Sequence, residues 1–116
     1  MNTVAITGRL GADPEMKYTP AGLAITKFSL AVNRQKRNDE GEQETDWFDV
    51  TCFGGAAETA GQYLDKGALV GVEGRLQQER WQTPEGDKRA RVVIIANRVD
   101  FLETKADAER RREVPE

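Results

Sequence analysis

Hydrophobic and polar residues alternate along much of this chain, and the stretch from residue 45 to residue 53 (TDWFDVTCF) shows the pattern most clearly. Successive side chains of a strand point to opposite faces, so Trp47 and Phe53 share one face while Phe48, Val50 and Cys52 share the other. We therefore predict a strand with one apolar face that belongs to a core or an interface. Its other face places two large aromatic rings among polar residues.

Similar alternation predicts four more strands, over residues 2–11, 23–33, 68–81 and 88–102. Residues 16–18 are expected to be extended between two turns, and residues 34–44, which are polar throughout, are expected to form a long mobile loop. Gly71 and Gly74 lie inside a predicted strand and indicate bends or a bulge.

Apolar residues recur at helical spacing over residues 56–64, and Gly67 follows at a position typical of a helix end. A second, short and exposed helix is predicted over residues 103–112. The order is three strands, a helix and two strands. This order predicts an all-β protein with a five-stranded OB-fold barrel and one short helix between strands 3 and 4.

The chain of 116 residues is long enough for one domain, which we expect over residues 1–102, followed by a short charged tail over residues 103–116. Cys52 is the single cysteine, so no intrachain disulfide can form, and no apolar run approaches the length of a membrane span. No secretory signal is recognisable near Met1, so we expect a cytoplasmic, nucleoid-associated protein without a membrane partner.

The net charge of −3 and the pI near 5.1 argue against a uniformly basic surface. Residues 1–102 hold 13 basic and 15 acidic side chains, so an acidic tail alone does not explain the charge. A binding surface for nucleic acid would therefore depend on how the charges are arranged.

Enzymatic function is not expected from these residues. The sequence contains no histidine, and no cluster of cysteine and histidine that could bind a metal. Cys52 has no base to activate it, and the acidic residues occur in exposed, charged stretches with nothing to separate their pKa values. We predict neither a catalytic site nor a cofactor.

Trp47, Phe53 and Trp81 are candidates for a platform on which unpaired bases stack. The alternative, that these rings pack in the core or in a subunit interface, stays open at this point. Basic residues near the polar stretch 34–44 and near the last predicted hairpin could neutralise phosphates. They include Arg34, Lys36, Arg37, Arg75, Arg80, Lys88, Arg89 and Arg91.

Four segments resemble bacterial single-stranded DNA-binding proteins with one OB-fold per chain: NTVAITGRLGADPEMKYTPAG, FSLAVNR, ETDWFDVTCFGGAAETAGQYLDKG and LVGVEGRLQQERWQTPEGDKR. The resemblance covers nearly all of residues 2–102. It implies an assembly, usually a homotetramer with a dimer as the other possibility, that wraps single-stranded DNA without sequence preference. It also implies that Trp47, Phe53 and Trp81 stack bases and that Lys17, Lys66 and Arg80 lie near the DNA path.

Two stretches depart from this family. Some members carry a further stacking tryptophan where this chain has Gln35-Lys36-Arg37, which implies more electrostatic contact there. Members typically end in an acidic tip that finishes in Pro-Phe and recruits replication and repair proteins. Val114-Pro115-Glu116 does not reproduce that tip, so the resemblance does not extend to the recruitment of such partners, and a truncated chain, a paralogue and a phage- or plasmid-borne form are the alternatives.

The sequence therefore predicts a protein that coats single-stranded DNA and protects it during replication, recombination and repair. Its predicted DNA contacts are Trp47, Phe53, Trp81, Lys17, Arg34, Lys36, Lys66, Arg75 and Arg80. An alternative is an OB-fold adaptor of the primosome kind, which binds proteins and has weak affinity for DNA.

Overall fold

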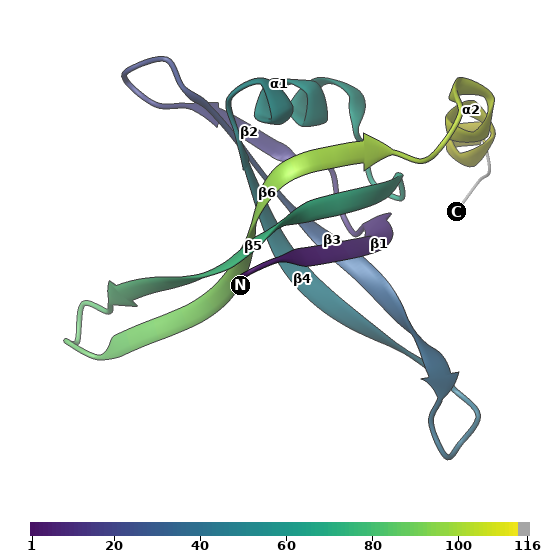
Figure 1. The fold of residues 1–116 in the computed structure, drawn as a ribbon, viewed down its shortest axis with the longest axis horizontal. Coiled ribbons are helices and arrows are strands. Elements are labelled where there is room, and N and C mark those ends of the chain that lie inside the picture. Colours follow the sequence, from purple (N-terminus) through teal and green to yellow (C-terminus); the bar gives the residue numbers. More distant parts are fainter. Residues whose placement is uncertain (114–116) are drawn as a thin grey trace.

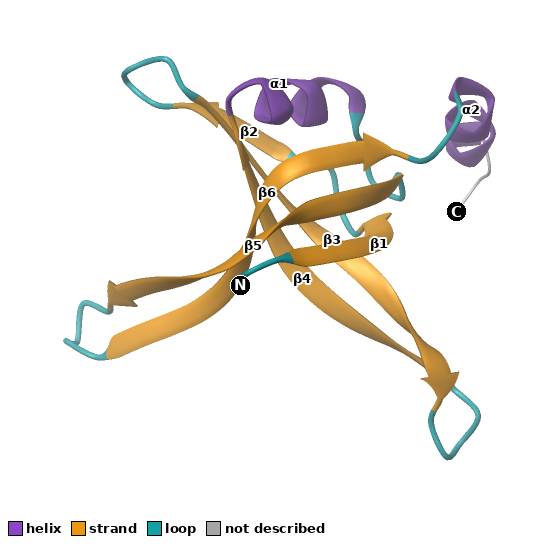
Figure 2. Ribbon diagram, in the orientation of Figure 1, coloured by secondary structure: helices purple, strands orange, loops and turns teal. Residues whose placement is uncertain are grey.

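A computed structural model describes residues 1–113 of the chain as six strands and two helices (Figures 1 and 2). The strands are β1 (Val4–Leu10), β2 (Glu15–Tyr18), β3 (Ala24–Arg37), β4 (Gln43–Phe53), β5 (Leu69–Gln82) and β6 (Lys88–Phe101). The helices are α1 (Gly54–Tyr63) and α2 (Lys105–Glu113). The tip Val114-Pro115-Glu116, on which the prediction about partner recruitment depended, lies outside the described residues.

Five of the strands close into a barrel in the order β1-β5-β6-β4-β3, with β3 pairing back to β1. All pairs are antiparallel except β4 with β6. The structure confirms the predicted OB-fold and adds one strand to it, because residues 15–18 pair with β3 as the edge strand β2. All four residues of β2 are exposed, so no alternation of buried and exposed positions marks this segment in the sequence.

The predicted irregularity in the fourth barrel strand is a bulge between Glu73 and Gly74, where the register of β5 against β6 shifts. A Cβ atom at Gly74 would lie 2.0 Å from the carbonyl oxygen of Ile95. Only glycine therefore allows the two backbones to approach this closely while the strands coil around the barrel.

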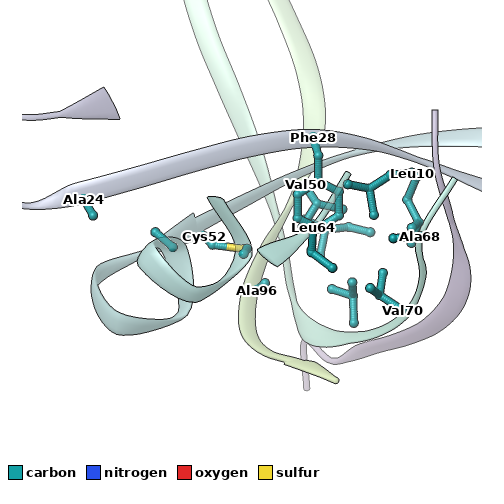
Figure 3. Packing of buried hydrophobic residues seen from close by; sticks show 14 residues of the cluster. Leu10, Ala24, Phe28, Val50, Cys52, Leu64, Ala68, Val70 and Ala96 are labelled. Atoms are coloured by element: carbon teal, nitrogen blue, oxygen red, sulfur yellow. The ribbon is translucent and has the colours of Figure 1, made fainter. Parts of the chain in front are cut away.

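The core lies inside the barrel, between its walls and α1 (Figure 3). Val50 and Cys52 of the opening stretch are buried there, as their alternation predicted. Phe48 begins the same row but is 36% exposed, and Thr51 is buried although it belongs to the opposite, polar row. The core includes Leu10, Phe28, Leu30, Val50, Cys52, Leu64, Val70, Val72 and Ile94.

Helix α1 covers one end of the barrel (Figure 1). It begins directly after β4, where Gly54 has a positive φ of 67° and turns the chain from strand to helix. Ala57 and Ala60 of this helix are buried against the barrel. The hydroxyl of Thr26 donates a hydrogen bond of 2.6 Å to the carbonyl of Ala57. These small residues let the helix lie close to β3.

The prediction of a long mobile loop over residues 34–44 was wrong. Strand β3 continues to Arg37 and β4 begins at Gln43, so these residues extend a hairpin beyond the barrel (Figure 1). Polar side chains hold this extension together: Thr45 donates to Asn33 over 2.8 Å, and the side chain of Asn38 accepts the backbone N–H groups of Glu40 and Glu42. Cross-strand polar pairs stabilise a strand outside the core without leaving any apolar pattern in the sequence.

Helix α2 lies beside the barrel and has no buried residue (Figure 1). It agrees with the predicted exposed helix over residues 103–112. Neither α1 nor α2 is long and apolar enough to cross a membrane, and no other helix occurs between residues 1 and 113.

Candidate nucleic-acid interface

Strands β2, β3 and β4 share an outer face that carries two of the predicted stacking residues. Paired residues of an antiparallel sheet place their side chains on the same face. Lys17 pairs with Ile25, Ile25 pairs with Phe53, and Trp47 pairs with Ala31. The register therefore places Lys17, Phe53 and Trp47 together on the face opposite the core.

The three aromatic rings are not core residues of this chain. Trp47 is 61% exposed, Phe53 42% and Trp81 49%. The ring of Trp47 lies against Gly11, where an added Cβ atom would come within 2.4 Å of it. The glycine gives the ring a close backbone support, so the ring keeps one face packed while much of its surface stays open to solvent.

Trp81 reaches this outer face from a different element, the hairpin of β5 and β6. Arg91 lies over it, with its guanidinium 6.0 Å from the ring centroid. The same guanidinium bonds to Glu79 at 2.9 Å and contacts Asp49 of β4 at 3.6 Å. Arg91 thus connects the Trp81 hairpin to the strand that carries Trp47 and Phe53. We call the surface formed by Lys17, Lys27, Trp47, Asp49, Phe53, Trp81 and Arg91 the aromatic face.

Two adjoining grooves cross the aromatic face, and Lys27 and Arg91 line both of them. The first, of about 220 Å³, runs between the loop after β1 and strands β3 and β4. The second, of about 610 Å³, continues along β5 past Arg80 and Trp81. The first groove also contains Asp13, Glu15 and Asp49, so its charge is mixed.

Lys27 is a candidate contact that is not among the DNA contacts predicted from the sequence. It pairs with Thr51 and with Glu15, and it lines the same groove as Trp81, which belongs to the hairpin of β5 and β6. The alternation of β3 shows that Lys27 is exposed. No sequence signal places it beside Trp81.

Four of the predicted basic contacts are exposed and have no carboxylate within 4.0 Å among residues 1–113. Lys17 belongs to the aromatic face, and Arg75 lies on β5 in the same row of alternate residues as Trp81. Arg80 donates to the side-chain oxygen of Gln78 at 2.7 Å. Lys36 lies near the far end of β3, on the hairpin extension.

Arg34 and Lys66 have different surroundings. Arg34 bonds to Asp46 at 3.1 Å and to Glu44 at 3.0 Å. The hydrogen bond that Arg34 donates to Asp46 is the main reason that the pKa of Arg34 is raised. Lys66 lies in the turn after α1, where its backbone N–H donates to Asp13 and its carbonyl accepts from Arg111. The structure therefore does not bring these two residues to Trp81.

Two carboxylates, those of Asp65 and Glu103, face arginines at a second place, which we call the α2 corner: Arg9, Asp65, Glu103, Arg111 and Arg112. Arg111 bonds to Asp65 at 2.9 Å and to Glu103 at 3.0 Å. The hydrogen bond from Arg111 lowers the pKa of Glu103. Burial alone would raise the pKa of Asp65, but the hydrogen bonds from Arg112 and Arg111 outweigh it and lower that pKa.

The side chains offer little for covalent or metal chemistry. Cys52 is fully buried, and desolvation raises the pKa of its thiol to about 11. At neutral pH it is therefore protonated, and a protonated, buried thiol is a poor nucleophile. Across residues 1–113, no group of three or more histidine, cysteine, aspartate or glutamate side chains is arranged to hold a metal ion.

A family model described as the single-strand binding protein family matches residues 1–102. The chain belongs to this family. It is 44% identical over 105 residues to single-stranded DNA-binding protein 3 of Listeria innocua, an alignment that covers 90% of this chain and 66% of that protein. It is 42% identical over 122 residues to the single-stranded DNA-binding protein of Thermotoga maritima, covering 99% and 86% of the two chains.

Single-stranded DNA-binding protein 1 of Synechocystis is 40% identical over 108 residues, covering 92% of this chain and 88% of the relative. The resemblance seen in the sequence is therefore confirmed. The chain spans about two thirds of the Listeria protein and most of the other two.

Proposed function

We propose that this protein binds single-stranded DNA without sequence specificity and protects it during replication, recombination and repair. One observation carries the proposal: an outer face of an OB-fold barrel carries three large, exposed rings, Trp47, Phe53 and Trp81. Every base has a π face, so stacking on such rings binds unpaired nucleotides of any sequence.

The charge arrangement supports phosphate contacts beside those rings. Lys17, Lys36, Arg75 and Arg80 are available as cations, and the grooves add Lys27. The net charge of −3 is compatible with this role because many carboxylates already face arginines, as at the α2 corner. Arg34 and Lys66 stay predicted contacts, but we expect a smaller contribution from Arg34 because two carboxylates compensate its charge.

The family and the names of the relatives favour this function over the protein-binding adaptor.

We propose that the protein is not an enzyme and acts in the cytoplasm, where the DNA is. We also propose that residues 1–102 form the DNA-binding domain and that the remaining charged segment is an appendage. The length of the family match and the position of α2 beside the barrel support this division.

We propose in addition that the protein acts as a homotetramer or, failing that, a dimer. Phe48 is 36% exposed, Leu76 46% and Val92 54%. Val50 pairs with Ile94 across β4 and β6, and Leu76 pairs with Ile94 across β5 and β6, so the three exposed side chains lie on one side of these strands. A second copy of the chain would bury this apolar group. Sedimentation equilibrium measures the mass, and a monomer at micromolar concentration would contradict the proposal.

Tryptophan fluorescence tests the DNA-binding function directly. Titration with oligo-dT at low salt is expected to quench the emission, because bases stack on Trp47 and Trp81. Affinity is expected to fall linearly on a log–log plot against salt, since phosphate contacts release counterions. Absence of quenching at low salt, together with equal affinity for duplex and single-stranded DNA, would rule out the proposed function.

A further inference from the structure

We propose that Arg91 is a positioning residue: it holds the hairpin of β5 and β6 so that Trp81 stays on the aromatic face. The proposal rests on the proposed function for its effect on DNA affinity, but its geometry can be tested without DNA. Arg91 is not among the DNA contacts predicted from the sequence, where it was only one of several basic residues near the hairpin that could neutralise phosphates.

The side chain of Arg91 connects the hairpin of β5 and β6 to β4. Its Nε donates to Glu79 at 3.0 Å and its second terminal nitrogen contacts the same carboxylate at 2.9 Å, so this pair is a fork within the hairpin. Its remaining terminal nitrogen contacts Asp49 at 3.6 Å. The contacts with Glu79 hold the guanidinium across the hairpin. The contact with Asp49 connects it to β4, the strand that carries Trp47 and Phe53.

The guanidinium also lies over the ring of Trp81, with its central carbon 6.0 Å from the ring centroid. Trp81 is two residues from Glu79 on β5, and alternate residues of a strand share a face. The carboxylate and the ring therefore hold Arg91 from the same side. In return, Arg91 restricts the ring, because a ring that rotated away would lose the cation–π contact.

The charge of Arg91 argues for positioning over phosphate binding. Two carboxylates, from Glu79 and Asp49, already compensate the single positive charge. A phosphate that approached Arg91 would meet both of these negative groups. Lys27, which lines the same grooves and has no carboxylate within 4.0 Å among residues 1–113, is better suited to contact phosphate.

Substitution of Arg91 by methionine keeps most of the side-chain volume and removes every one of these contacts. We expect the motion of the Trp81 ring to increase in the free protein. In a Trp47→Phe background Trp81 is the sole tryptophan, so time-resolved fluorescence anisotropy reports on it alone. Arg98→Met is the matched control, because Arg98 lies on the same strand and pairs with Asp100 at 3.2 Å but does not line either groove.

In the same background, Arg91→Met is expected to weaken oligo-dT binding by about five- to tenfold, the combined size of an exposed ion-pair network and a cation–π contact. The slope of log affinity against log salt is expected to stay unchanged, because no phosphate contact is lost. Arg91→Lys is expected to behave like the methionine variant, because an ammonium group cannot contact Glu79, Asp49 and the Trp81 ring at the same time through separate nitrogens.

Asp49→Asn distinguishes positioning of Trp81 from phosphate binding, because the two roles of Arg91 predict opposite changes in the affinity for oligo-dT. If Arg91 positions Trp81, the loss of Asp49 loosens the hairpin, so affinity falls and the ring becomes more mobile. If Arg91 binds phosphate, removal of a competing carboxylate raises the affinity.

The proposal is overturned if Arg91→Met leaves the anisotropy decay of Trp81 equal to that of the Arg98→Met control. It is also overturned if the salt slope drops by about 0.7, which is the loss of one phosphate contact to a single strand. Failure of all variants and of the parent protein to bind oligo-dT would overturn the proposed function. The anisotropy result would still decide the role of Arg91.

Discussion

The aromatic face and the α2 corner contain the same arrangement of charges, but the surroundings of the central arginine differ. In each, one arginine contacts two carboxylates from separate elements: Arg91 with Glu79 and Asp49, and Arg111 with Asp65 and Glu103. The side chain of Arg91 is 47% exposed and lies over a tryptophan, whereas that of Arg111 is 20% exposed and serves to hold a polar helix.

The difference shows that charge pairing alone does not indicate a binding surface. At the α2 corner the ion pairs of Arg111 and Arg112 connect α2, which has no buried residue, to Asp65 in the turn after α1. At the aromatic face the ion pairs orient a ring that remains open to solvent. The same type of contact is therefore structural in one place and, by our proposal, functional in the other. Four predictions test this contrast.

The largest expected effect is on DNA binding and comes from the rings. Trp81→Ala and Trp47→Ala should each weaken oligo-dT binding by about 1–3 kcal/mol, because each removes one stacking partner. Fluorescence anisotropy of a labelled oligonucleotide measures the affinity. Tyr63→Ala is the matched control: Tyr63 is 60% exposed and lines an apolar hollow beside α2 with Phe101 and Ala108. If Tyr63→Ala lowered the DNA affinity as much as Trp81→Ala does, the DNA-binding surface would extend to the α2 corner. The two regions would then no longer differ in function.

The second prediction concerns stability. Arg111→Met should lower the free energy of unfolding by about 1–2 kcal/mol, because it removes a guanidinium donor from two partly buried carboxylates, Asp65 and Glu103. Urea unfolding measures the change. DNA affinity should not change, since Arg111 does not belong to the aromatic face. Arg110→Met, which removes the same charge from the exposed side of α2, should have little effect on stability.

The third prediction is the pH dependence of the α2 corner. The pKa values of Glu103 and Asp65 are lowered in the folded protein, so their contribution to stability is complete above their unfolded pKa values of about 4. It is lost as the pH falls through the lowered folded values. The stability difference between the parent and Arg111→Met should therefore shrink between pH 7 and pH 3. A difference that stays constant over this range would show that Arg111 acts through packing alone.

The smallest expected effect concerns single phosphate contacts. Lys27→Met should reduce the slope of log affinity against log salt by about 0.7, because one fewer counterion site is released on a single strand. Arg34→Met serves as the comparison, since Glu44 and Asp46 already compensate the charge of Arg34. Its slope should stay near that of the parent. Equal reductions for the two variants would mean that the carboxylates release Arg34 when DNA binds.

The sequence by itself determined the barrel and the identity of the rings. A strand between core and solvent must alternate, so the alternation of residues 45–53 separated Val50 and Cys52 from Trp47 and Phe53 before any pairing was known. The glycines in the fourth barrel strand predicted the bulge at Gly74 for a similar reason, because the backbone approach there excludes a side chain.

Only the tertiary structure decided which side chains meet. The hairpin extension at residues 34–44 depends on cross-strand polar pairs, and such pairs are visible only once the register is fixed. The proximity of Asp49, Arg91 and Trp81 depends on the coiling of β5 and β6 toward β4, which brings together residues more than 30 positions apart. Alternation specifies the face of a strand on which a side chain lies, but the partner across that face is set by how the barrel closes.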